Sequence, residues 1–111
     1  MANTSETPFH CEIEKSVDDG ANVTTVRCHG RLVNQTAAEV KDIVKPLISQ
    51  GGSIVIDLSD VSFLDSLGLG TLVGLKVSAI NEGYCTLTLA HLTPRIQDLL
   101  RLTNLTSLFS S

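Results

Sequence analysis

The sequence predicts a single α/β domain in which helices pack on a mixed β-sheet of four to five strands. Three observations indicate this class. Apolar stretches with strand and helix periods alternate along the chain, glycine or proline separates them, and 111 residues suffice for only one hydrophobic core. The expected order is β-β-α-β-α-β-α, with residues 1–8 as a flexible lead and residues 9–111 as the domain.

The first two elements read as an antiparallel hairpin. Apolar residues alternate loosely from Phe9 to Val17 and again from Val23 to Gly30, as in half-exposed strands. Between them lies Asp18-Asp19-Gly20, which is typical of a tight turn.

The next segment predicts a helix and then a central strand. Thr36 and Glu39 have the spacing of a capping box, and an apolar stripe at helical spacing follows. Pro46 lies inside this stripe and lacks an amide donor, so the helix is expected to bend or restart there. The β-branched segment Ser53–Leu58 is expected to form a strand, followed by a loop.

A second helix is expected from Leu67 to Glu82, closed by Gly83. Its buried face is expected to hold five apolar residues: Leu69, Leu72, Val73, Val77 and Ile80.

The end of the chain predicts a strand, a helix and a last helical turn. Residues Tyr84 to Ala90 alternate as a strand does. Thr93-Pro94 is a typical helix start, since Thr caps and Pro fits the first turn. Asn104 to Phe109 is expected to form the final turn.

Composition excludes several classes of function. The formal net charge is -4 and the eight basic residues are scattered, which argues against direct binding of nucleic acid. No run approaches the ~20 apolar residues of a membrane span, so no membrane insertion is expected. The polar first ten residues and three cysteines without CxxC spacing favour the cytoplasm, with the thiols free and at least half-buried.

The sequence also predicts that the protein is not an enzyme and needs no cofactor. Ser66 lacks the glycine two residues earlier that a nucleophile elbow requires, and no motif links a histidine to it. The lysine of a phosphate-binding loop is absent. Asp57, Asp60 and Asp65 share a segment, but no histidine accompanies them there, so no metal site is expected.

Ser66 itself admits two interpretations. A serine between a loop and a helix commonly caps the helix, which is worth about 1 kcal/mol. Gly68 and Gly70 lie in the first turn, where each glycine costs about 1 kcal/mol relative to alanine. Gly68 is therefore expected to leave the helix start open to a partner or a phosphate.

The residues resemble the STAS domain, and within it the bacterial anti-sigma factor antagonists, from about Cys11 to Phe109. Three segments carry the resemblance: Gly30-Arg31-Leu32, Ile56-Asp57-Leu58 and Val61-Ser62-Phe63-Leu64-Asp65-Ser66-Leu67-Gly68-Leu69-Gly70. The sequence departs from the family at Val33, where an aspartate is frequent, and at Leu67, where a small residue is usual.

The resemblance implies a protein-binding switch in sigma-factor-dependent transcription. Its partners would be an anti-sigma factor that is also a serine kinase, bound when the protein is unmodified, and a phosphatase that restores binding after phosphorylation. Ser66 would be the phosphorylated residue. The residues implied in partner binding surround it: Asn34, Thr36, Asp65, Ser66, Leu67, Gly68 and Leu69. A non-switching STAS binding module, such as a cytoplasmic subunit of a lipid ABC transporter or a signalling scaffold, remains the alternative.

Overall fold

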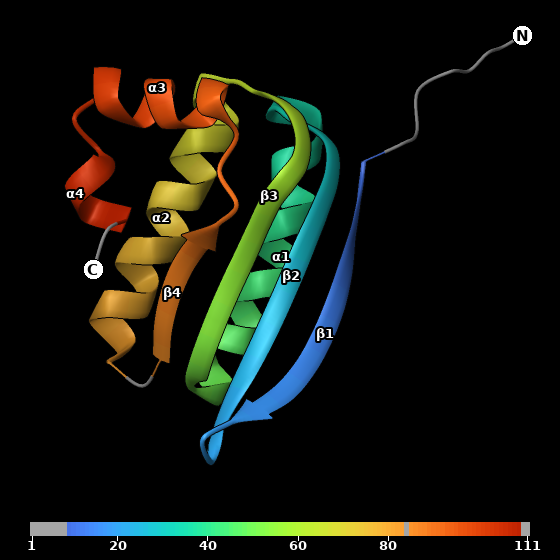
Figure 1. Ribbon diagram of the computed structural model, residues 1–111, viewed down its shortest axis with the longest axis vertical. Coiled ribbons are helices and arrows are strands. Elements are labelled where there is room, and N and C mark those ends of the chain that lie inside the picture. The colour runs from blue at the N-terminus through green and yellow to red at the C-terminus, as the bar shows by residue number, and fades with distance from the viewer. Residues whose placement is uncertain (1–8, 84, 110–111) are drawn as a thin grey trace, which may run out of the picture.

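The computed structural model describes residues 9–83 and 85–109 of the chain (Figure 1). The expected lead at residues 1–8, Tyr84 and residues 110–111 lie outside the described part. The elements in chain order are β1 (His10–Asp18), β2 (Ala21–Leu32), α1 (Asn34–Gln50), β3 (Gly52–Leu64), α2 (Ser66–Glu82), β4 (Cys85–Ala90), α3 (Pro94–Leu102) and α4 (Thr106–Phe109). This order confirms the predicted β-β-α-β-α-β-α pattern, and α4 is the expected last turn.

The strands form one mixed sheet in the order β1-β2-β3-β4. The β1–β2 hairpin is antiparallel, whereas β2 with β3 and β3 with β4 are parallel pairs. Asp19 and Gly20 form the hairpin turn with positive φ angles of 54° and 82°. The predicted Asp-Gly turn is therefore confirmed, because glycine and aspartate tolerate this left-handed region.

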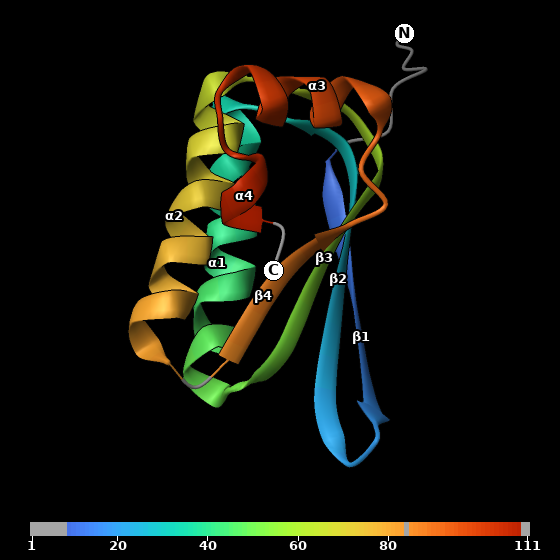
Figure 2. The same cartoon turned by 60° about the vertical axis from the view of Figure 1, so that its left-hand side comes forward.

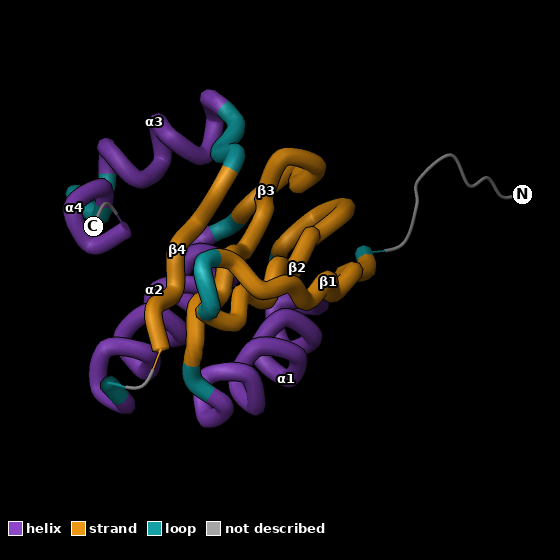
Figure 3. Tube along the Cα trace, turned by 60° about the horizontal axis from the view of Figure 1, so that its bottom comes forward, coloured by secondary structure: helices purple, strands orange, loops and turns teal. Residues whose placement is uncertain are grey.

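Helices α1 and α2 lie side by side on one face of the sheet (Figure 2). The Cα trace, turned so that the bottom of Figure 1 comes forward, shows the same two layers (Figure 3). Helix α3 lies across the end of the molecule where α2 begins, and α4 lies beside α2 and β4, so neither covers the opposite face of the sheet (Figures 1 and 2). That opposite face carries polar side chains, among them Arg27, which pairs with Glu14 at 2.8 Å.

The core is aliphatic and lies between the sheet and helices α1 and α2. Fully buried side chains come from β2, α1, β3, α2 and β4: Val26, Leu32, Val40, Val44, Ile56, Leu58, Leu72 and Leu87. At about 25 cal/mol per Å² of apolar surface removed from water, this burial is the main stabilising term.

Three expectations about single elements were wrong. Helix α1 begins at Asn34 rather than Thr36, and it does not restart at Pro46 but runs without a break to Gln50. The missing amide of Pro46 costs one hydrogen bond, while Leu47 and Ile48 anchor the last turn in the core. Strand β3 continues to Leu64, because its second half pairs with the end of β2.

The buried face of α2 also differs from the prediction. Leu69 and Leu72 are buried as expected, but Val77 and Ile80 are 43% and 58% exposed. The face that meets the sheet instead includes Leu75 and Ala79. Over a helix of 17 residues the apolar residues surround the axis, so periodicity alone did not define one face.

No helix among the described residues is long and apolar enough to cross a membrane.

Candidate functional site

Ser66 is the first residue of α2 and is exposed at the end of the sheet where β2 and β3 finish. The preceding strand β3 carries the chain to Leu64, and Asp65 is the single residue between strand and helix. The side chain of Ser66 therefore projects from the first turn of a helix whose start is fixed by the sheet.

Asp65, and not Ser66, caps α2. Its Oδ1 accepts a hydrogen bond from the amide of Gly68 at 2.7 Å, and its backbone is extended, as at most helix caps. The predicted capping role of Ser66 is wrong. Both residue types cap well, and Asp65 is held in place by its own amide, which donates to the carbonyl of Leu32 at 3.3 Å.

The same carboxylate joins the starts of two helices. Oδ2 of Asp65 accepts a hydrogen bond from the amide of Asn34, the first residue of α1, at 3.2 Å. Negative charge at a helix start is favoured by the helix dipole. Asp65 therefore holds the N-termini of α1 and α2 next to each other and makes this junction acidic.

Thr36 has a different role from the expected one. It is the third residue of α1, and its Oγ1 accepts from the amide of Val33 at 2.9 Å while donating to the carbonyl of Arg31 at 2.6 Å. Thr36 thus fastens the end of β2 to the helix start, and Val33 occupies the cap position. The predicted capping box from Thr36 to Glu39 is wrong.

Gly68 is buried, and the expectation that it opens the helix start is wrong. A Cβ atom at this position would lie 2.2 Å from the carbonyl oxygen of Leu32 and 3.0 Å from Cδ1 of Leu64. Glycine is needed because the first turn of α2 packs directly on the end of β2. Its amide is not open to a ligand, because Asp65 binds it.

The implied partner-binding residues therefore divide into two groups. Asn34, Ser66 and Leu67 are exposed, and Leu67 keeps 54% of its surface accessible. Thr36 and Asp65 are half-buried, whereas Gly68 and Leu69 are buried. The exposed residues and, in part, the half-buried Thr36 and Asp65 can contact a partner, whereas the buried Gly68 and Leu69 support the site from below.

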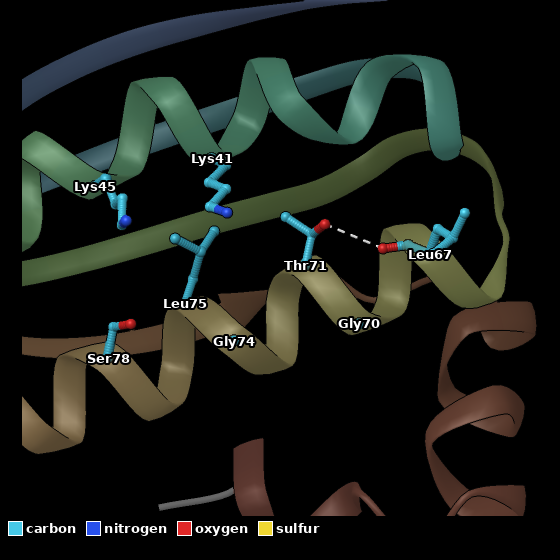
Figure 4. A pocket seen from close by; sticks show the side chains of 8 residues that line it. All are labelled: Lys41, Lys45, Leu67, Gly70, Thr71, Gly74, Leu75 and Ser78. Carbon is cyan, nitrogen blue, oxygen red and sulfur yellow. Dashed lines mark hydrogen bonds between the residues drawn. The ribbon is translucent and has the colours of Figure 1, made fainter.

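A groove of about 390 Å³ runs from this junction between α1 and α2. The side chains of Lys41 and Lys45 point from α1 toward α2 (Figure 4). On the α2 side the lining consists of Leu67, Gly70, Thr71, Gly74, Leu75 and Ser78. Apart from the adjoining backbone of α2, no atom of the described residues lies within 4 Å of the positions that a Cβ would take at Gly70 and Gly74. These two glycines therefore have no packing role of the kind Gly68 has, and they widen the groove.

Asp57 and the cysteines, which the sequence also singled out, are not part of this groove. Asp57 forms an ion pair with Arg27 at 3.7 Å and accepts a hydrogen bond from the amide of Ser59. Burial would raise the pKa of Asp57, but the Ser59 hydrogen bonds and the charges of His91 and Arg27 hold it below its ordinary value. The cysteines are free and at least half-buried, as predicted.

Sequence reasoning missed one cluster. Asp60 does have a histidine partner, since His29 lies 2.7 Å from it across the β2–β3 pair. The two residues are 31 positions apart, so only the strand register brings them together.

Comparison with known proteins places these observations in a family. Residues 12–110 match the STAS domain. The anti-sigma-B factor antagonist of Bacillus subtilis is 33% identical over 93 residues, which cover 84% of each chain.

Solved structures agree on the fold. The anti-sigma factor antagonist from Mycobacterium paratuberculosis superposes with a TM-score of 0.72 at 24% identity, covering 95% of this chain and 87% of that one. The unphosphorylated form of the anti-sigma factor antagonist SpoIIAA superposes with a TM-score of 0.67 at 19% identity, covering 89% and 83% of the two chains.

Proposed function

The chain belongs to the STAS domain family, and on this premise we propose that it is an anti-sigma factor antagonist switched by phosphorylation of Ser66. In the unmodified state it binds an anti-sigma factor, which thereby releases its sigma factor. The anti-sigma factor is itself a serine kinase, and a phosphatase reverses the modification. The protein acts by binding and not by catalysis.

The observation that carries this proposal is that Ser66 is exposed and takes no part in capping its helix. Its hydroxyl is exposed on the first turn of α2, and the adjoining cap is made by Asp65, so modification does not remove a structural hydrogen bond. The exposed side chain of Leu67 lies next to it. A partner that packs on this helix start meets both exposed residues.

The groove between α1 and α2 extends this surface. Lys41 and Lys45 line one side of it, which favours a partner segment with carboxylate side chains. Two glycines in an exposed helix cost about 1 kcal/mol each relative to alanine. Since Gly70 and Gly74 contact nothing at their Cβ positions, we attribute this cost to the space that a partner needs.

Phosphorylation would reverse binding through charge. A phosphoserine carries about two negative charges, and at Ser66 it would stand beside the carboxylate of Asp65. A hundredfold loss of affinity corresponds to about 2.8 kcal/mol. Burying an unpaired phosphate under a bound partner costs at least this much free energy. Phosphorylation can therefore prevent binding without any change in the fold of the domain.

The direct test is to locate the phosphate. The purified protein is incubated with ATP and the serine-kinase anti-sigma factor of the same genome, and the modified residue is mapped by mass spectrometry. We expect a single phosphate on Ser66. Ser62 is the built-in control, because it is also exposed but lies on β3, where its hydroxyl donates to the carbonyl of Gly30 at 3.4 Å. Modification of Ser62 instead of Ser66 would contradict the proposal, and no modification at all would favour a binding module without a switch.

A further inference from the structure

Three strands bring two imidazoles and two carboxylates together on the sheet. His10 and Glu12 lie two residues apart on β1 and therefore on the same face. His10 pairs in register with His29 of β2, and His29 pairs with Asp60 of β3. The neighbour of His29 in the strand, Cys28, belongs to the core, so the cluster lies on the face that α1 and α2 do not cover.

The distances within this cluster are short enough for its side chains to share one ion after they rotate. The ligand atoms of His10, Glu12 and His29 all lie within 4.8 Å of one another. Zinc ligands at about 2.0–2.1 Å from a tetrahedral ion are about 3.4 Å apart, so small rotations of exposed side chains suffice. The rings of His10 and His29 are stacked, with centroids 4.7 Å apart and an angle of 15° between their planes, so His10 has to turn out of the stack to bind the same ion as His29.

His29 faces an acceptor with each of its ring nitrogens. Nδ1 lies 2.7 Å from Oδ2 of Asp60, and Nε2 lies 3.0 Å from Oε1 of Glu12. A neutral imidazole has one N–H group, so it satisfies only one of the two carboxylates. When Nδ1–H donates to Asp60, Nε2 therefore presents its lone pair, and not a proton, to the Glu12 side.

Asp60 has the position of an outer-shell partner. Histidines that bind a metal through one nitrogen usually donate the other N–H to a carboxylate, which sets the tautomer and the ring orientation. With Nδ1–H donating to Asp60, the lone pair of Nε2 points toward Glu12. This is the orientation that a shared ion between His29 and Glu12 needs.

We propose that His10, Glu12 and His29 bind a divalent transition-metal ion of the zinc class, with Asp60 as the positioning residue. Two imidazoles and one carboxylate form an N/O ligand set that suits Zn²⁺ and not Mg²⁺ or Ca²⁺. The fourth position is left for water. The bound ion links the edge strand β1 to β2, and through Asp60 to β3. It is independent of Ser66.

The test is metal binding to the untagged protein, stripped of metal and kept at about pH 8, where free imidazoles are neutral. Calorimetric titration with Zn²⁺ is expected to give one ion per chain and a higher melting temperature. His10→Gln and His29→Gln should each weaken binding at least tenfold, and Asp60→Asn should weaken it by about 10–100-fold. His91→Gln is the matched control, because His91 lies after β4 and outside the cluster, and it should bind as the wild type does.

Cobalt distinguishes this site from the cysteines. Cys11 and Cys28 lie 3.5 Å apart on the two strands that carry the cluster, so their thiols are the competing ligands. We expect the Co²⁺ spectrum to lack a thiolate charge-transfer band. Such a band, equal affinity in all variants, or the absence of Zn²⁺ binding by the wild type would each overturn the proposal. Circular dichroism of every variant confirms that the losses are not due to unfolding.

Discussion

Oδ2 of Asp65 accepts the amide hydrogen bond of Asn34 at 3.2 Å, so a single carboxylate connects the start of α2 with the start of α1. The second oxygen of the same group caps α2 through Gly68. The residue before the proposed phosphorylation site is thus a structural link between two helices, and Ser66 is left with no part in it.

Replacing Asp65 should therefore destabilise the domain. Asp65→Ala removes both hydrogen bonds, and we expect the free energy of unfolding in urea to fall by about 1–2 kcal/mol for the lost cap alone. Ser66→Ala is the matched control and should change it by less than about 0.5 kcal/mol, as at other surface positions. Equal losses in the two variants would mean that the cap is shared between them.

The glycines of α2 should separate into two kinds. Gly68→Ala places a methyl group 2.2 Å from the carbonyl oxygen of Leu32, and should lower the free energy of unfolding by at least about 2 kcal/mol. Gly70→Ala and Gly74→Ala meet no atom within 4 Å and should each raise it by up to about 1 kcal/mol.

The groove glycines also test the partner surface. If Gly70 and Gly74 make room for a partner, the Gly70→Ala,Gly74→Ala double variant should melt at a higher temperature and bind the anti-sigma factor more weakly. Calorimetric titration measures the second effect. Unchanged affinity in this more stable variant would remove the groove from the binding surface.

Asp57 predicts a loss of stability in acid. Its pKa is lower in the folded protein than the ordinary value of 3.8, so its ionised form is favoured by folding. The resulting stability is fully present above pH 3.8 and is lost as the pH falls through the lower, folded pKa. Urea unfolding of Asp57→Asn between neutral and acid pH should show a weaker dependence over this window. An identical pH dependence in variant and wild type would exclude Asp57 as a cause.

The order of elements could be predicted because strand and helix periods are local properties of the chain. The length of β3 could not, since Ser59 to Ser62 are polar at several positions and become a strand only by pairing with β2. The site shows the same division. Ser66 could be singled out from its motif, but the choice of Asp65 as the cap depends on its hydrogen bonds with Leu32 and with Asn34, 31 positions away.

Gly68 and the histidine cluster were misjudged for a related reason. Both depend on contacts between segments distant in sequence: the first turn of α2 with the end of β2, and three strands in register. Neither contact leaves a periodic signal in the chain. The sequence does not distinguish a glycine that opens a surface from a glycine that allows close packing. At Gly68 the distinction comes from the carbonyl group of Leu32, which lies against it.

The central claim, that charge at Ser66 controls partner binding, is tested most directly by the affinity of Ser66→Asp for the anti-sigma factor. Aspartate is tolerated in the first turn of a helix, so the variant should remain folded, as circular dichroism can verify. Calorimetric titration should show that Ser66→Asp binds at least tenfold more weakly than the wild type, whereas Ser66→Ala binds equally well. If Ser66→Asp binds as tightly as the wild type while folded, charge at this position is not the switch.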